Sequence, residues 1–277
     1  MHHVGSPRPS PPFRGAPIAT SLATAIRDLQ RRKARDRRGL ALIEGIRLVE
    51  DALAAGVPFR GVVVGPELER TARGGELVAE LGRRAVTVET LSARMFDGLA
   101  ATDTPQGVIA IVQPRRWKVE DLAPGDGTVY LVLDGVQDPG NVGTLLRTAH
   151  ALGAAGTMAL RGTADVLNPK ALRAAMGATF RHPVISLDDA RFIAWARQHG
   201  VTLWATAADG TPLSRALEPA GRRGPVAVIV GNEGAGIRPA LNAVSAQRIA
   251  IPLAQGAESL NVAVAAGILL FEVSRAG

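Results

Sequence analysis

The chain has 277 residues, 47% of them hydrophobic, which is enough for one large folded domain or two ordinary ones. Its formal net charge of +7 favours a polyanionic partner such as nucleic acid, although an arginine-, alanine- and glycine-rich composition is also explained by genomic base composition. Because the sequence has no cysteine, no zinc-ligand spacing among its histidines, no signal peptide and no membrane-length apolar run, we expect a cytoplasmic protein without a metal or a membrane partner.

The beginning of the chain is polar and basic. Residues 1–17 are rich in proline, and we expect a disordered tail there. From Ile18 onwards, apolar residues at helical spacing predict a helix, and arginines recur along it at a similar spacing. The pattern predicts a positive stripe beside an apolar stripe. The arginines of this stripe are Arg27, Arg31, Arg35 and Arg38.

A first α/β domain is predicted over residues 18–112, because short β-like runs alternate there with helical patterns. Residues 113–126 mix proline, glycine and charge with few periodic apolar positions, which is typical of a linker. The predicted strands of the first domain are 40–44, 59–65, 85–89 and 107–113, and the predicted helices after Glu44 are 46–55, 75–83 and 92–99.

A second domain, residues 127–277, alternates apolar strands and helical patterns more regularly. Continuous apolar strands separated by helices predict a parallel sheet covered on both faces. Ligands of such sheets bind beyond the carboxyl ends of the strands, and three polar loops occupy that position here. The predicted strands are 128–134, 156–161, 182–186, 201–207, 225–231 and 247–253.

The first loop follows the strand that ends at Asp134. Asn141 is placed to cap the next helix, which we expect to end near Gly153. Gly143 and Arg147 lie on one side of that helix, so a phosphate or sugar could approach the guanidinium beside a patch without side chains. The other interpretation is that Gly143 allows close helix packing and Arg147 is an ordinary surface residue.

The second loop contains Gly231, Gly234 and Gly236 between an apolar strand and a helix. Such a loop can present backbone N–H groups to an anion or to the polar edge of a nucleotide. It matches neither the dinucleotide-binding fingerprint nor a phosphate-binding P-loop. Within it, Glu233 is either a surface carboxylate or a partner for a cation such as Arg147.

The third loop lies close to the end of the sequence, between the strand 247–253 and a helix predicted to begin near Leu260. It carries Gly256, Ser259 and Asn261, and Ser259 taken alone is a typical helix N-cap. Each of the three loops is a weak signal when considered separately. Their order and chemistry together are more specific.

Together the three loops resemble the SpoU (TrmH-like) family of the SPOUT methyltransferases. Residues 31–112 are similar to the RNA-binding domain, related to ribosomal protein L30e, that many members carry. The matching motifs are Asn141-x-Gly143-x-x-x-Arg147, Gly231-Asn232-Glu233-Gly234-x-Gly236, and Ile251-Pro252 through Ser259-Leu260-Asn261-Val262.

The resemblance implies a fold and a cofactor. The implied fold is α/β: a C-terminal parallel-sheet SPOUT domain with a deep trefoil knot, preceded by the small L30e-like domain. The knot would bring the third loop back to the ligand-binding edge of the sheet and form the binding site for S-adenosylmethionine there. The family also implies a homodimer that pairs through the knotted domain. The expected cofactor-binding residues are Ile229, Val230, Gly231, Ile251, Gly256 and Leu260.

The implied reaction is methyl transfer to a ribose 2′-OH of structured RNA, with ribosomal RNA favoured over tRNA. Such a site must stabilise a developing alkoxide. A guanidinium stays protonated in proteins and is a poor base, so we assign Arg147 to a flanking phosphate and to the negative oxygen. Asn141, Glu233, Ser259 and Asn261 are expected to position Arg147 and the ribose. Arg147 would lie near a dimer interface. The general base is either a side chain or the RNA itself, and the sequence does not decide between them.

Two other classes are kept as alternatives. One is an RNA-binding or assembly protein without catalysis, which the polar motif residues argue against and which a failure to bind S-adenosylmethionine would favour. The other is a dinucleotide-dependent oxidoreductase. Its only support is the glycine loops, because no acidic residue is placed to hold a ribose after a dinucleotide-binding turn.

Overall fold

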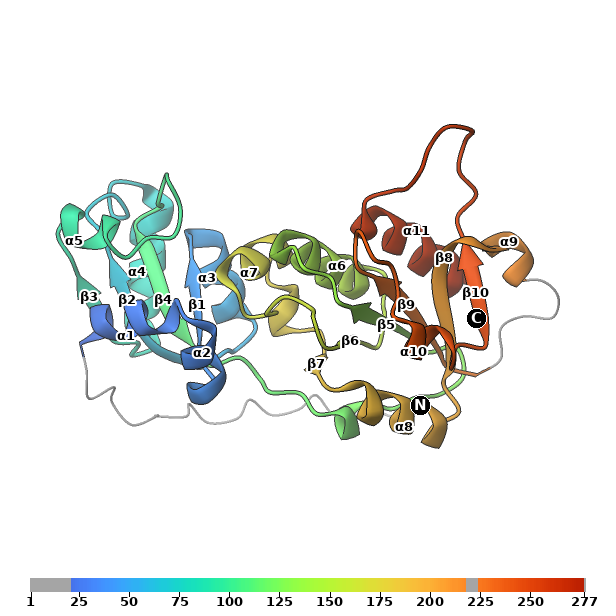
Figure 1. The fold of residues 1–277 in the computed structure, drawn as a ribbon. Coiled ribbons are helices and arrows are strands. Elements are labelled where there is room, and N and C mark those ends of the chain that lie inside the picture. The colour runs from blue at the N-terminus through green and yellow to red at the C-terminus, as the bar shows by residue number, and fades with distance from the viewer. Residues whose placement is uncertain (1–20, 218–223, 277) are drawn as a thin grey trace, which may run out of the picture.

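A computed structural model describes residues 21–217 and 224–276, and the predicted tail over residues 1–17 lies outside them. Figure 1 shows two sheets placed end to end along the long axis of the molecule, the N-terminal sheet at one end and the C-terminal sheet at the other. Helix α7 (Pro169–Ala175) lies between them. No helix within the described ranges is both long and apolar enough to cross a membrane.

The basic N-terminal segment forms two short helices instead of one, α1 (Leu22–Leu29) and α2 (Arg32–Arg38). Arg31, with an extended backbone, is the N-cap of α2, so the helical spacing is broken between the two. Arg35 turns inward and is 2% exposed. The predicted single positive stripe is therefore wrong: Arg27, Arg31 and Arg38 are exposed, but Arg35 is not on the surface with them.

The N-terminal sheet has four strands in the order β1-β4-β2-β3. The pairs β1–β4 and β2–β4 are antiparallel, and β2–β3 is parallel. The four predicted strands and the three helices predicted after Glu44 are all found here, with shifted ends. The strands are β1 (Ala41–Glu44), β2 (Phe59–Val64), β3 (Val88–Thr90) and β4 (Val108–Val112), and the helices are α3 (Ile46–Ala54), α4 (Ala72–Arg83) and α5 (Ala93–Asp97).

The C-terminal sheet has six strands in the order β10-β8-β9-β5-β6-β7, and all its pairings are parallel, as predicted. The linker between the two sheets contains a single short helical turn, η1 (Val119–Asp121). The strands are β5 (Val129–Asp134), β6 (Gly156–Ala159), β7 (Val184–Ser186), β8 (Thr202–Pro212), β9 (Val226–Gly231) and β10 (Gln247–Ala250).

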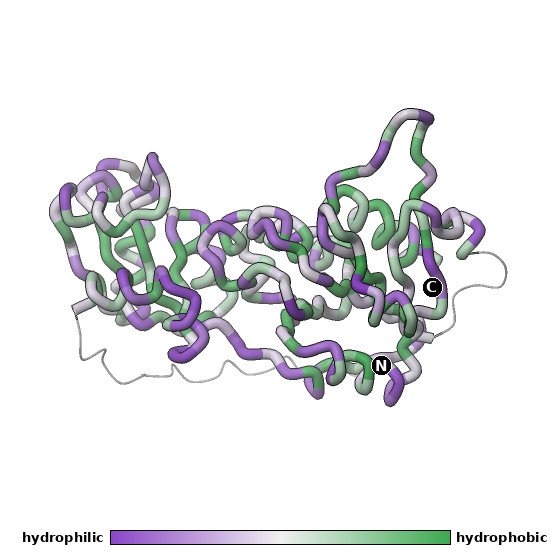
Figure 2. The backbone as a smooth tube through the Cα atoms, in the orientation of Figure 1, coloured by the Kyte–Doolittle hydropathy of each residue, from purple (hydrophilic) through white to green (hydrophobic). Residues whose placement is uncertain are grey.

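Helices cover both faces of this sheet because its strands are apolar on both sides. Leu131 and Leu133 of β5 face one apolar core with α6, α7 and α11, whereas Tyr130 and Val132 face a second core with α8 and α10. Figure 2 shows the sheet strands as the hydrophobic centre of the domain. The helices are α6 (Pro139–Ala151), α7 (Pro169–Ala175), α8 (Asp189–Gln198), α9 (Leu213–Ala216), α10 (Pro239–Asn242) and α11 (Val262–Arg275).

The chain passes from β10, at one edge of the sheet, to α11, which packs on α6 and over β5 and β9. Between β10 and α11, residues 251–261 form a long loop that stands out from the body in Figure 1. The C-terminal helix therefore returns from the edge strand to the centre of the domain.

Gly143 of α6 is buried against α7. A Cβ added at this position would lie 2.2 Å from the carbonyl oxygen of Ala171 and 2.6 Å from Cβ of Ala174. The interpretation of Gly143 as an open patch for a phosphate is therefore wrong, and close helix packing is its role.

We predict that Gly143→Ala destabilises the protein by about 1–3 kcal/mol, because the new methyl group has to push α6 and α7 apart. Gly75→Ala in α4 is the matched control, since a Cβ there meets nothing within 4 Å. The control should be neutral or stabilising by up to about 1 kcal/mol through helix propensity. Urea unfolding of both variants measures the difference, and equal stability would contradict the packing role.

Candidate cofactor pocket and its loops

A pocket of about 520 Å³ lies at the carboxyl ends of β9 and β10 and beside the middle of β8. The second and third polar loops line it, and the first loop is joined to them by the hydrogen bonds of Asn141. One wall is apolar, and two carboxylates, Glu233 and Glu258, lie among the lining residues. The apolar side chains include Val230, Ile237, Ile249, Ile251, Leu253, Leu260, Val262 and Leu269.

The second loop is a tight turn held by its own asparagine. The side-chain oxygen of Asn232 accepts hydrogen bonds from the backbone N–H groups of Gly234 and Ala235, at 3.0 and 2.9 Å. Its amide nitrogen donates to the carbonyl oxygen of Gly135 at 2.9 Å, which ties the second loop to the first. A Cβ on Gly231 would lie 2.3 Å from the carbonyl carbon of Gly236, so the turn closes only with glycine at position 231.

Three polar side chains form a hydrogen-bonded chain that joins the three loops. Nδ2 of Asn261 donates to Oδ1 of Asn141 at 3.1 Å, and Nδ2 of Asn141 donates to Oε1 of Glu233 at 2.9 Å. The chain fixes the amide orientation of Asn141, because one side of the amide accepts and the other donates. Three of the predicted catalytic residues are thus brought into direct contact.

Glu233 is ionised at neutral pH. Its partial burial alone would raise the pKa of its carboxyl group. Hydrogen bonds from the Asn141 amide and from backbone N–H groups, including that of Gln137, outweigh this effect and lower the pKa below its ordinary value. A carboxylate with a lowered pKa is a weak base, so its environment suits a fixed anionic acceptor better than a proton acceptor.

Two predicted helix caps are wrong. The N-cap of α6 is Asp138, whose carboxylate accepts from the backbone N–H of Asn141 at 2.9 Å and binds Nζ of Lys170 at 2.7 Å. The N-cap of α11 is Asn261, whose oxygen accepts from the backbone N–H groups of Ala263 and Val264. Asn141 and Ser259 are therefore not the N-cap residues of these helices.

The other predicted site residues are distributed unequally. Val230, Gly231, Ile251, Leu260 and Ser259 line the pocket. The remaining ones do not: Ile229 is fully buried in the core beside α8 and α10, Gly256 lies in the exposed loop, and Arg147 is exposed on α6. Within the part of the chain that the structure describes, Arg147 has no hydrogen bond or ion pair, so its guanidinium is available to a ligand or to another chain.

An ion-pair network that was not predicted from the sequence anchors the second loop. The carboxylate of Asp134, whose side chain is fully buried, accepts from the backbone N–H and from Nε of Arg238, at 2.8 and 2.6 Å. The same guanidinium donates two hydrogen bonds of 2.8 Å to Asp189 of α8. One signal was present in the sequence, because Asp134 is an acidic residue at the end of an otherwise apolar strand.

A parallel α/β sheet with a pocket at its strand ends, closed by polar and glycine-containing loops, defines a nucleotide-type ligand-binding domain. Comparison with known families then identifies the family. Residues 128–271 match the SpoU rRNA Methylase family, and residues 24–110 match the MRM3-like substrate binding domain. The chain belongs to the SpoU rRNA Methylase family, as its three loops predicted.

Named relatives resemble the whole chain. The 23S rRNA (guanosine(2553)-2′-O)-methyltransferase RlmP of Bacillus subtilis (strain 168) is 34% identical over 246 residues, which cover 88% of this chain and 92% of that protein. The 23S rRNA (adenosine(1067)-2′-O)-methyltransferase of Streptomyces laurentii is 31% identical over 84% of this chain and 85% of its own. These two relatives act on different nucleosides of the same RNA.

Solved structures agree with the fold. The AdoMet-bound rRNA methyltransferase from Sinorhizobium meliloti superposes with a TM-score of 0.79 at 33% sequence identity, covering 94% of this chain and 97% of that one. The α/β fold with a parallel sheet and a separate N-terminal domain is therefore shared over nearly the full length.

We predict that the ionised carboxylate of Glu233 stabilises the fold. Its folded-state pKa is lowered, so the stabilisation is present above the ordinary value of 4.5 and is lost as the pH falls through the folded-state pKa. Glu233→Gln should therefore be less stable than the unsubstituted protein at neutral pH, and the difference should vanish in acid. Denaturant unfolding from pH 3 to pH 7, about the range set by the carboxyl titration, measures it.

Asn141→Ala is the companion variant, because it removes the side-chain hydrogen bond that lowers the pKa of Glu233. The pH-dependent difference caused by Glu233→Gln should be smaller in this background. A difference that stays constant with pH would contradict the assignment.

Proposed function

We propose that the protein transfers a methyl group from S-adenosylmethionine to a ribose 2′-OH of ribosomal RNA, which places the reaction in the cytoplasm. The observation that carries this function is the hydrogen-bonded chain Asn261–Asn141–Glu233 beside the pocket, since it unites the three motif loops at one sheet edge. The two relatives named above are 23S rRNA 2′-O-methyltransferases, and this chain is similar to them over most of their length. Their activities support the choice of reaction and RNA.

The pocket fits S-adenosylmethionine chemically. Val230, Ile251 and Leu260 offer an apolar wall for the adenine, and Gly231 lies beside them at the end of β9. Carboxylates of Glu233 and Glu258 suit a ligand with cationic groups. When bound, the cofactor supplies an electrophilic methyl group on a positively charged sulfur.

The side chains around the pocket act on the ribose and its phosphates. Asn141 and Glu233, fixed by their mutual hydrogen bond, orient the hydroxyl and hold hydrogen-bonding groups in place before the reaction. The exposed guanidinium of Arg147 binds a flanking phosphate and stabilises the oxygen as it loses its proton. Ser259 contributes a further hydroxyl at the pocket wall.

A homodimer through the C-terminal domain is the proposed assembly. Helix α11 presents an apolar stripe on its outer side, formed by Val264, Ile268 and Phe271, which are 52%, 40% and 46% exposed. These residues follow each other at helical spacing, and such a stripe on a soluble protein is a typical interface. Dimerisation would also allow the exposed guanidinium of Arg147 to serve the partner's pocket. Sedimentation of Ile268→Glu, expected to be monomeric, tests this assembly.

The return of α11 to the centre of the domain supports the deep trefoil knot. The helix follows an edge strand but packs on α6, the first helix of this sheet. We propose that the segment after β10 passes through the loop formed by residues 231–248, or through an adjacent loop, before α11 packs on α6. Slow refolding, measured after complete denaturation, is the expected signature, and refolding in milliseconds would contradict a knot.

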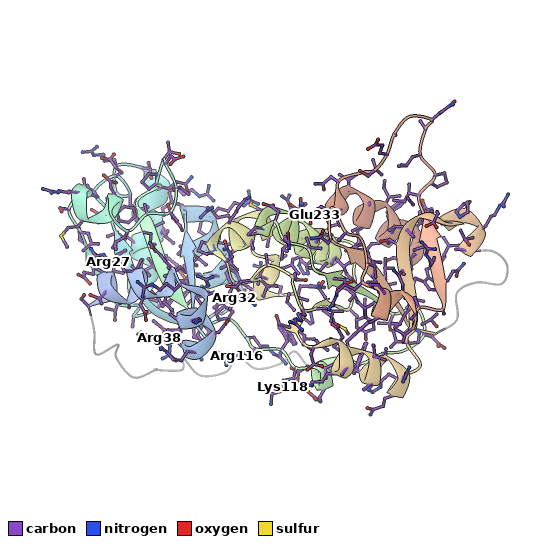
Figure 3. All side chains as sticks on the ribbon, viewed as in Figure 1. Arg27, Arg32, Arg38, Arg116, Lys118 and Glu233 are labelled. Atoms are coloured by element: carbon purple, nitrogen blue, oxygen red, sulfur yellow. The ribbon has the colours of Figure 1, made fainter. Side chains whose placement is uncertain are left out.

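Exposed cations of the N-terminal domain and linker are proposed to hold the RNA backbone. Figure 3 shows Arg27, Arg32, Arg38, Arg116 and Lys118 along one edge of the molecule. Of the predicted RNA-binding arginines, Arg27 and Arg38 belong to this set, Arg31 is also exposed, and Arg35 is buried. Phosphate contacts of this kind give salt-dependent binding without base recognition.

The first test is binding and transfer. Calorimetric titration should show binding of S-adenosylmethionine but not of NAD or ATP, and incubation with protein-free transcripts should methylate 23S rRNA at a ribose 2′-OH. Methylation of tRNA alone would move the substrate to the alternative class. Folded protein that binds RNA but not S-adenosylmethionine would contradict the enzyme and favour an assembly protein, and selective NAD binding would favour an oxidoreductase.

The second test concerns Arg147. We expect Arg147→Ala to lower kcat about a hundred-fold, the usual effect of losing one donor to a developing negative charge. Arg147→Lys should recover only part of this rate, because an ammonium group lacks the planar fork that binds a phosphate and an oxygen together. Single-turnover methyl transfer measures both variants. Near-normal turnover of Arg147→Lys would count against the fork, and Arg197→Lys on α8 is the control.

A further inference from the structure

A buried ion pair joins the two domains. Nε and Nη2 of Arg35, on α2, donate to Oδ2 of Asp165 at 2.9 and 2.5 Å, and the two side chains are 3% and 9% exposed. Asp165 lies in the loop that follows β6 of the C-terminal sheet. Among the ion pairs of the described residues, this is the one that connects the N-terminal domain with the C-terminal domain.

On the N-terminal side, the same guanidinium holds α1 and α2 together. Nη1 of Arg35 donates to the carbonyl oxygens of Leu29 and Gln30, at 2.9 and 2.7 Å. These carbonyls lie at the end of α1, where the helix itself supplies no partners. Arg35 therefore fixes the two helices that carry Arg27, Arg31 and Arg38.

On the C-terminal side, the loop of Asp165 is bonded to the segment that carries the first motif. Oγ1 of Thr163 donates to the carbonyl oxygen of Leu133 and accepts from the N–H of Gly135, at 2.9 and 3.1 Å. The N–H of Ala164 donates to the carbonyl oxygen of Val136 at 2.8 Å. That segment leads directly into α6, so the ion pair ends close to the loops of the pocket.

Apolar contacts also join the domains. Leu172 of α7 and Phe180 pack into the buried cluster of the N-terminal domain. Such contacts favour association but are not directional, so they tolerate sliding and rotation. Two hydrogen bonds cross from Arg35 to one carboxylate oxygen of Asp165, and two more fix the guanidinium to the end of α1. Charge-assisted hydrogen bonds of this kind are directional, so they oppose rotation more than apolar contacts do. The angle between the domains therefore depends on Arg35 and Asp165 more than on the apolar contacts.

We infer that Arg35 and Asp165 are positioning residues for the RNA: they fix the angle between the basic surface of the N-terminal domain and the pocket, so that bound RNA presents its ribose to the methyl donor. This inference rests on the proposed function. It assigns to Arg35, which the sequence suggested as a phosphate contact, a role that needs no contact with RNA.

The distance between the domains tests the inference directly. The chain has no cysteine, so Glu69→Cys and Arg197→Cys, both at exposed positions, give one spin-label pair across the domains. Labelled protein is mixed with excess unlabelled protein to exclude distances between protomers. Asp165→Asn should broaden the distance distribution. Glu50→Gln, which breaks an exposed ion pair with Arg73 inside the N-terminal domain, should leave it unchanged.

Methyl transfer by the same variants completes the test. Asp165→Asn should bind S-adenosylmethionine and RNA as the unsubstituted protein does, yet lose at least about ten-fold in kcat, because a misplaced ribose seldom reaches the reactive geometry. An unchanged distance distribution, or kcat equal to that of Glu50→Gln, would overturn the inference. Inactivity of the unsubstituted protein would instead overturn the proposed function.

A second variant covers the case in which Asp165→Asn does not fold. Arg35→Met combined with Asp165→Leu replaces the pair by apolar side chains and leaves no unpaired buried charge. It should fold, keep its affinity for S-adenosylmethionine and still show a broadened distance distribution with a lower kcat. A narrow distribution in this double variant would mean that the apolar contacts alone set the angle, contrary to the inference.

Discussion

The hydrogen-bonded chain Asn261–Asn141–Glu233 is the contact on which the candidate site depends. Its members come from three loops, and each does something besides joining the next. Asn261 caps α11, Asn141 lies in the first turn of α6, and Glu233 lies in the glycine turn after β9. Two helix beginnings and one turn are thereby held in a single arrangement. Movement of any one of them would cost a hydrogen bond between groups that have few other partners.

The surroundings of this chain separate two kinds of chemistry. The pocket beside it is walled by aliphatic side chains from the ends of β9 and β10, which suits a flat, largely neutral ring. Its polar edge consists of fixed amides and carboxylates, and Arg147, which has no ion pair with any residue that the structure describes, lies outside it on α6. The Asp134–Arg238–Asp189 network holds the second loop from below, so the polar edge is supported by residues that need not contact a ligand themselves.

The charged residues of the N-terminal domain divide in a similar way. Most arginines of α1 and α2 are exposed and form the positive surface. Arg35 is buried instead, and it donates four hydrogen bonds to acceptors within the protein. A charge removed from water is costly unless it is fully paired, so its retention calls for a role that an apolar residue could not fill. Directional attachment of one domain to the other is such a role, and it makes the relative placement of RNA surface and pocket part of the fold.

The sequence by itself determined the elements and the family. Continuous apolar runs predicted the parallel sheet, and the polar loops after those runs predicted where the ligand site lies, because both patterns are local and repeat along the chain. Only the tertiary structure decided which residues meet. Asn141 and Asn261 are 120 positions apart, Arg35 and Asp165 are 130 apart, and Gly143 is confined by a different helix. Spacing along one helix gives the direction of a side chain relative to that helix, but burial and partners depend on what packs against it, and that is fixed only when the whole chain folds.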